Sequence, residues 1–226
     1  MGLATKIFFP ALCFGCGFPG DYLCQRCKRS RVGFNFQQEC HVCRKAVFSK
    51  FIHNECRQYT YLDGVVVGTQ FQGVIKQMVH DFKYGGVARL APVLGDILIV
   101  SWRLRSVAGS EGAVVVPIPT TAFRRKWRGY NQAELLAQEV ARGLGLHLQL
   151  GLTKQHGMQT QVGKSRSARL ASQWQGMQLA AGFEWKGRSV ILVDDVMTTG
   201  ATLEAAAKAL RMAGAARVYA LVCARG

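Results

Sequence analysis

The chain has 226 residues, of which 49% are hydrophobic, and its formal net charge is +16. This composition excludes a disordered or fibrous protein and fits one ordinary α/β domain with a small appendage. No stretch approaches the roughly 20 continuous apolar residues of a membrane span, and the positive charge indicates an anionic partner unless it reflects only a basic proteome.

The first residues of the chain superficially resemble a signal or lipoprotein peptide. Pro10 interrupts their apolar run, only Lys6 precedes it, and bulky Leu12 stands where a small residue precedes a lipidated cysteine. We therefore expect a cytoplasmic protein.

The next stretch contains seven of the eight cysteines of the chain, and six of these seven form three Cys-x-x-Cys pairs. A fourth pair has histidine in its first position. Two-residue spacing lets both side chains of a pair face one metal ion, and tetrahedral Zn²⁺ takes two such pairs. Consecutive pairing predicts two structural zinc sites, the first made of Cys13, Cys16, Cys24 and Cys27 and the second of Cys40, Cys43, His53 and Cys56.

Some alternatives to this pairing remain open. The pairs can interleave, a single site can be occupied, and His41 competes with His53 as a ligand. Disulfides are not expected in a cytosolic chain, and a redox Cys-x-x-Cys normally stands once, beside a βαβ unit. We expect a double zinc-ribbon arm over residues 1–59 and a second domain over residues 60–226.

The second domain alternates predicted strands and helices. Apolar patterning predicts strands at 64–71, 113–116, 147–152, 189–193 and 217–223, and helices at 74–82, 89–105, 132–144 and 201–213. This order predicts an α/β fold with a parallel sheet flanked by helices, and a ligand at the carboxyl ends of the strands. The polar stretch 153–173 is predicted to be a mobile loop.

One segment, residues 120–131, combines cations and aromatic rings without an acidic residue: Arg124, Arg125, Lys126, Trp127, Arg128 and Tyr130. We predict that it is a solvent-facing loop. Cations that bind phosphates and rings that stack on bases suit single-stranded DNA. The arm adds nine Lys or Arg against three Asp or Glu. The tryptophans Trp102, Trp174 and Trp185 are expected to be core or loop anchors.

The most informative stretch is residues 190–202, V-I-L-V-D-D-V-M-T-T-G-A-T. Its four aliphatic residues lack the alternation of a half-exposed strand and predict a strand buried on both faces. Two adjacent carboxylates and a hydroxyl-rich turn with Gly200 follow, and then a helix. The turn and the helix N-terminus form a cup for a phosphate, while the carboxylates can accept hydrogen bonds from neighbouring sugar hydroxyls. The pattern fits a ribose 5-phosphate.

This stretch resembles the 5-phosphoribosyl 1-pyrophosphate (PRPP) motif of the type I phosphoribosyltransferase fold, and every motif position is filled. The resemblance implies Asp194 and Asp195 at the ribose hydroxyls. It implies that the 5-phosphate lies among Met197, Thr198, Thr199, Gly200, Ala201 and Thr202.

The diphosphate of PRPP needs basic groups and a metal ion. The candidates are Arg124, Arg128 and the backbone after Pro119, with Mg²⁺ held largely by PRPP itself. Lys164 and Arg166, in the polar stretch, are the candidate catalytic residues that close over the diphosphate.

Three further segments identify a family resemblance: V-P-I-P at 116–119, R-G-Y-N-Q-A-E-L-L-A at 128–137 and F-Q-G-V-I-K-Q-M-V-H-D-F-K-Y-G-G at 71–86. Together with the cysteine arm, they make the whole chain similar to the competence protein F (ComF/GntX) family. The histidine usual in that family two residues after V-P-x-P is Thr121 here. This departure bears on catalytic turnover more than on PRPP binding.

Two functions follow from the resemblance. The first is a PRPP-binding protein of natural competence that handles single-stranded DNA in DNA uptake, with protein partners in the uptake machinery. The second is an active phosphoribosyltransferase acting on an unidentified nucleobase or nucleic-acid-linked acceptor. A near-match to an ATP-binding loop at 157–165 is set aside, because five residues separate its glycines where four are required.

Overall fold

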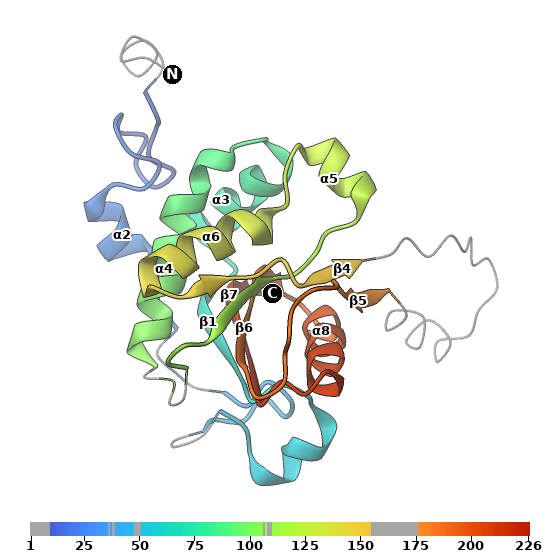
Figure 1. The fold of residues 1–226 in the computed structure, drawn as a ribbon. Coiled ribbons are helices and arrows are strands. Elements are labelled where there is room, and N and C mark those ends of the chain that lie inside the picture. The colour runs from blue at the N-terminus through green and yellow to red at the C-terminus, as the bar shows by residue number, and fades with distance from the viewer. Residues whose placement is uncertain are drawn as a thin grey trace, which may run out of the picture.

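The computed structural model describes residues 10–35, 37, 39–47, 51–105, 107, 110–154 and 176–226. Its centre is a five-stranded parallel sheet in the order β1-β7-β6-β2-β3 (Figure 1). The strands are β1 (Gly64–Gln70), β2 (Val114–Pro117), β3 (His147–Leu148), β6 (Ser189–Met197) and β7 (Arg217–Arg225). The predicted fold class, a parallel sheet flanked by helices, is confirmed.

Helices cover both faces of this sheet (Figure 1). Helices α3 (Gly73–Tyr84), α4 (Ala91–Leu104) and α6 (Gln132–Leu144) pack on one apolar cluster, and α8 (Ala201–Met212) packs on the other. Alternate residues of β6 supply the two clusters, since Ile191 lies in the first and Leu192 in the second. The prediction that residues 190–193 are buried on both faces is therefore confirmed.

The single strand predicted at 147–152 is wrong, because the chain divides there into two strands. Only β3 joins the main sheet, while β4 (Leu152–Lys154) pairs antiparallel with β5 (Met177–Leu179). The break falls at Gly151, where a Cβ atom would lie 2.1 Å from Cζ2 of Trp185. The chain passes directly against the buried indole at this point. Thr153 and Lys154 belong to β4, and the rest of the predicted polar loop lies outside the described residues.

The loop predicted for residues 120–131 is also wrong, because its middle forms helix α5 (Ala122–Arg128). The hydroxyl of Thr121 caps this helix by accepting a hydrogen bond from the Arg124 N–H at 3.3 Å. Gly129 ends it with a left-handed φ of 80°. No residue of α5 is buried, so the helix carries no apolar stripe from which the sequence could have predicted it.

The cysteine-rich arm packs against the rest of the chain at several places. Near the first cysteine cluster, Lys28 of helix α2 (Gln25–Arg31) pairs with Asp96 of α4 at 3.0 Å. Farther along, the Asn35 N–H donates to Gly68 O of the edge strand β1 at 2.9 Å. The segment that follows contains the second cluster and the 3₁₀ helix η1 (Asn54–Tyr59). The arm thereby covers part of the exposed sheet edge. Among the helices of the described residues, none is long and apolar enough to span a membrane.

Candidate functional site

A cavity of about 250 Å³ lies at the carboxyl ends of β2 and β6. Its walls come from the end of α3, the segment after β2, helix α5, the start of α6, strand β4 and the turn after β6. Six of the residues predicted to hold PRPP line it, namely Arg124, Arg128, Asp194, Asp195, Thr198 and Thr202. Parallel strands bring their carboxyl ends to one edge, which is why distant segments meet here.

The two acids at the end of β6 are held by short-range hydrogen bonds. Oδ1 of Asp194 accepts from the Asp195 N–H at 2.9 Å, and Oδ1 of Asp195 accepts from the Val196 N–H at 2.6 Å. Asp195 is buried and also pairs with Lys83, whose Nζ lies 2.9 Å from Oδ1. Withdrawal from water, and then the charge of Asp195, raise the pKa of Asp194 to about 7, against the opposing charges of Lys83 and Lys154.

The turn between β6 and α8 leads directly into the N-terminus of that helix. Met197 is buried beneath it, whereas Thr198 and Thr199 are exposed. Gly200 adopts φ 79°, a left-handed conformation that glycine reaches without strain, and stands at the N-cap of α8. The Ala201 N–H donates to the Thr199 hydroxyl at 3.3 Å. The positive end of the α8 dipole therefore faces the side of the cavity that Thr198 and Thr202 line.

The opposite wall of the cavity is cationic. Arg128 donates through Nη1 to Gln132 Oε1 at 3.1 Å, and its guanidinium lies 5.1 Å from the centre of the Tyr84 ring. Its Nε is buried and has no hydrogen-bond partner among the described residues. Arg124 is exposed at the rim. A buried donor without an acceptor, beside a second cation, fits an anionic ligand.

The segment R-G-Y-N-Q positions this wall. The Tyr130 hydroxyl and the Gln132 amide both donate to Phe82 O at the end of α3, at 2.7 and 3.1 Å. Asn131 donates to Ile118 O at 3.2 Å and accepts from the Ala133 N–H. These contacts join the start of α6 to α3 and to the end of β2.

Sequence reasoning did not assign Lys83, Tyr84 or Lys154 to the site, although all three line the cavity. The basic, glycine-rich turn K-Y-G-G was the available signal for the first two. The candidate catalytic residues Lys164 and Arg166 lie outside the described residues, so their placement stays a prediction.

Two groups of four ligand atoms lie in the described part of the arm, and their grouping is the consecutive one. The first is Cys13, Cys16, Cys24 and Cys27, and the second is Cys40, Cys43, His53 and Cys56, with ligand atoms all within 4.8 Å of one another in each group. These two clusters can hold metal ions.

The choice between the two histidines is clear from their neighbours. Nδ1 of His53 lies 3.2 Å from Cys43 Sγ, and Nε2 lies 3.1 Å from Ala46 O, a carbonyl that fixes the ring. His41 instead contacts Thr60 at 2.9 Å and Glu204 at 3.3 Å. His53 is therefore the histidine that faces the cluster.

The thiols of the first cluster have different pKa values. Burial alone would raise the pKa of Cys13, but hydrogen bonds from the N–H groups of Cys24 and Gly15, each 3.4 Å from Sγ, lower it to about 6. Burial and the adjoining thiols raise the pKa of Cys27 to about 12. A metal ion bound by these four sulfurs would hold them as thiolates, and thiolate sulfur is a preferred ligand of Zn²⁺.

Comparison with known proteins agrees with this architecture. Residues 130–226 match the phosphoribosyl transferase domain family. Competence protein F of Haemophilus influenzae is 28% identical over 196 residues, which cover 85% of each chain. Competence protein ComFC of Bacillus subtilis is 29% identical over 86% of this chain and 74% of its own. DNA utilization protein YhgH of Escherichia coli is 28% identical over 92% of this chain and 94% of its own. These relatives confirm the resemblance to competence protein F.

Proposed function

We propose that this chain, a homologue of competence protein F over most of its length, binds PRPP and handles single-stranded DNA during natural transformation in the cytoplasm. One observation carries the PRPP part of the proposal. A single cavity joins the two acids at the end of β6 to the N-terminus of α8 and to four cations, Lys83, Arg124, Arg128 and Lys154.

Each part of PRPP has a chemical counterpart in this cavity. The carboxylates of Asp194 and Asp195 would accept hydrogen bonds from the two ribose hydroxyls. The two acids are adjacent at the strand end and both line the cavity, so they suit two neighbouring hydroxyls. The turn 197–202, with the dipole of α8, would hold the 5-phosphate. Arg124, Arg128 and the backbone after Pro119 would face the diphosphate. Mg²⁺ bound to the diphosphate oxygens would neutralise the leaving group.

The two clusters of the arm are proposed as structural zinc sites, because each combines four cysteine or histidine ligands without an open position. We also propose the division of the chain into an arm of residues 1–59 and a phosphoribosyltransferase-like domain of residues 60–226. The arm would then fold with its metals, and the domain would fold around its own core.

The DNA part of the proposal is supported by the names of the relatives, by the charge of +16 and by α5. This helix carries three exposed cations beside Phe123 and Trp127, whose exposed fractions are 71% and 63%. Exposed rings among cations suit stacking on bases with phosphate contacts beside them. Protein partners in the uptake machinery are part of the same proposal.

The alternative function is an active phosphoribosyltransferase with a nucleobase or nucleic-acid-linked acceptor. The match of residues 130–226 to the phosphoribosyl transferase domain favours it. In that function Lys164 and Arg166 would close over the diphosphate.

One purified sample can distinguish the two functions. The experiment measures pyrophosphate release from Mg²⁺–PRPP and binding of a labelled single strand, each with and without the other ligand. The proposal expects strand binding while PRPP stays intact. Pyrophosphate release that depends on DNA or on free bases would favour the alternative, and binding of neither ligand would contradict both.

A further inference from the structure

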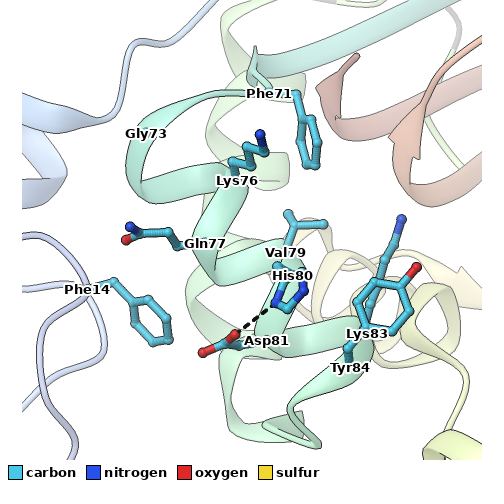
Figure 2. A pocket seen from close by; sticks show the side chains of 10 residues that line it. All are labelled: Phe14, Phe71, Gly73, Lys76, Gln77, Val79, His80, Asp81, Lys83 and Tyr84. Carbon is cyan, nitrogen blue, oxygen red and sulfur yellow. Dashed lines mark hydrogen bonds and ion pairs between the residues drawn. The ribbon is translucent and has the colours of Figure 1, made fainter.

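The two cysteine clusters lie differently against the rest of the chain. Beside the first cluster, Figure 2 shows a cavity of about 750 Å³, with Phe14 of the arm and Gln77 of α3 in its wall. At the second cluster there is direct contact with α8, because Nε2 of His41, the residue after Cys40, lies 3.3 Å from Oε1 of Glu204. The second cluster is therefore joined to the first turn of the helix whose N-terminus faces the smaller cavity.

We infer that Glu204 is a positioning residue for PRPP, which holds the N-terminus of α8 in place through its contacts with the arm. The second cysteine cluster, and not the first, then sets the affinity for the 5-phosphate. The inference rests on the proposed function, because it concerns how the cavity binds PRPP. Glu204 acts from outside the site, since the described residues that line the smaller cavity include Thr202 of α8 but not Glu204.

Both carboxylate oxygens of Glu204 are held by the arm and the two residues that follow it. The Thr60 hydroxyl donates to Oε1, and the Tyr61 N–H donates to Oε2 at 3.0 Å. Nε2 of His41 lies 2.9 Å from the hydroxyl oxygen of Thr60 as well as close to Oε1. Because the hydroxyl gives its one hydrogen to Glu204, and a carboxylate only accepts, Nε2 is the donor in both contacts.

This cluster of polar groups is shielded from water and balances the charge of the carboxylate. The side chains of His41 and Glu204 are 8% and 16% exposed. Burial alone would raise the pKa of Glu204, but its hydrogen bonds with His41, Thr60 and the Tyr61 N–H lower it. The carboxylate is therefore ionised and firmly held. Its charge is directed at three donors instead of opposing a phosphate at the same end of the helix.

The backbone of Glu204 connects these contacts to the turn proposed to hold the 5-phosphate. Its N–H donates to Gly200 O at 2.9 Å, across the first turn of α8. Gly200 is the N-cap residue and has no side chain that could cap the helix. The N–H groups of a first turn lack partners within the helix, and they are the groups that meet an anion there. A shift of Glu204 would therefore move the groups that bind the phosphate.

The other end of α8 provides a matched control. Arg211 donates through Nε to Tyr61 O at 3.2 Å and pairs with Asp63, so the same segment of chain holds both ends of the helix. Glu204 and Arg211 lie roughly 10 Å apart along the axis, at 1.5 Å per residue. Loss of the Arg211 contacts should lower stability without displacing the turn before α8.

The experiment uses the full-length, metal-loaded protein and calorimetric titration with three probes. These are PRPP with Mg²⁺, ribose 5-phosphate, and pyrophosphate with Mg²⁺. The variants are Glu204→Ala, Glu204→Gln and His41→Ala, with Arg211→Ala as the control. Metal content, melting temperature and amide hydrogen exchange at residues 198–204 are measured on the same samples.

We expect Glu204→Ala and His41→Ala to weaken binding of PRPP and ribose 5-phosphate roughly 2- to 30-fold, the range for residues that act on a site without touching its ligand. Exchange at residues 198–204 should become faster in both. Pyrophosphate binding should stay as in the wild type, because only the 5-phosphate is proposed to lie at α8. Arg211→Ala should melt at a lower temperature but bind PRPP like the wild type.

The conservative variant Glu204→Gln should restore affinity close to that of the wild type. Its amide oxygen accepts from the Tyr61 N–H, and its amide nitrogen can donate to Nε2 in the other tautomer of His41. The geometry of the turn is then kept without the charge. An affinity of Glu204→Gln as low as that of Glu204→Ala would contradict positioning through these hydrogen bonds.

The two cysteine clusters are compared through one ligand of each. His53→Ala, in the second cluster, should weaken binding of ribose 5-phosphate, whereas Cys16→Ser, in the first, should not. Equal effects of the two substitutions would contradict the role given to the second cluster.

Wild-type affinity for PRPP and ribose 5-phosphate in both Glu204→Ala and His41→Ala would overturn the inference and leave the proposed function standing. An equal loss in Arg211→Ala, or an equal loss for pyrophosphate, would also overturn it, because either result indicates general loosening of the fold. Absence of PRPP binding by the folded wild type would contradict the proposed function. Hydrogen exchange then decides the positioning role alone, and unchanged exchange in Glu204→Ala would overturn it.

Discussion

Lys83 Nζ lies 2.9 Å from Oδ1 of Asp195, so the end of α3 is joined to the end of β6 inside the smaller cavity. The two side chains are 23% and 8% exposed, and the pair is therefore largely shielded from water. The acid proposed to bind the ribose is thus held, without ligand, by a cation that sequence reasoning had not assigned to the site.

Replacement of Lys83 should affect both stability and binding. Lys83→Ala leaves the buried Asp195 carboxylate unpaired, and we expect a loss on the order of 3 kcal/mol in the free energy of unfolding. The double variant Lys83→Ala, Asp195→Asn should regain much of that loss but not PRPP affinity. Urea denaturation of the two variants measures this, and equal stability of Lys83→Ala and wild type would show that the pair contributes nothing.

The raised pKa of Asp194 predicts a pH-dependent gain in stability for Asp194→Asn. The pKa of this carboxyl is about 7 in the folded protein, whereas its ordinary value is 3.8. Between about pH 4 and pH 7 the folded state therefore keeps a proton that the unfolded state has released. The contribution of Asp194 to stability therefore falls as the pH rises from about 4 to 7. Asp194→Asn lacks this loss.

Melting temperatures at pH 5 and pH 8 test this prediction. The gain of Asp194→Asn over wild type should be larger at pH 8 than at pH 5, and PRPP affinity should fall at both. A difference that is independent of pH would contradict the assignment of the raised pKa to Asp194.

Metal analysis should find about two Zn²⁺ per chain. His53→Ala should lower the content toward one, because His53 directs Nδ1 at Cys43, whereas the control His41→Ala should keep both ions. A chelator should unfold the arm and leave the larger domain folded, since metal binding and folding are coupled. A protein without metal whose arm is folded would contradict this prediction.

Trp127 should contribute to strand binding through stacking. Trp127→Ala is expected to weaken binding by roughly 1–3 kcal/mol, and Tyr59→Ala, a ring of 71% exposure on η1, is the control. Arg124→Ala should flatten the log–log salt dependence by about 0.7, the value for one phosphate contact on a single strand. Strand binding that is insensitive to salt would argue against the electrostatic part of the proposal.

The sequence predicted those elements whose burial leaves a periodic pattern. Residues 190–193 read as a doubly buried strand because β6 lies between two apolar layers. Helix α5 had no such pattern, because caps at Thr121 and Gly129 hold a helix that buries nothing. The break between β3 and β4 depends on Gly151 meeting Trp185, a contact that only the folded chain creates.

The candidate site shows the same division. The acids and the turn after β6 are contiguous in the chain, so their joint chemistry could be recognised from the sequence. Lys83 is more than a hundred positions away from Asp195, and only the sheet edge brings them together. Likewise, the spacing of the sequence could not decide whether His41 or His53 is the metal ligand. The structure decides it, because His41 contacts Glu204 of α8 instead of the cysteine cluster.

Calorimetric titration of PRPP with Mg²⁺ measures whether the smaller cavity binds PRPP. The samples are the wild type and Asp195→Asn, in which one charged acceptor for a ribose hydroxyl is lost at the same side-chain size. We expect measurable affinity for the wild type and a loss of roughly 1.5–3 kcal/mol for the variant. No heat of binding from the folded wild type, or equal affinity in the two proteins, would contradict it.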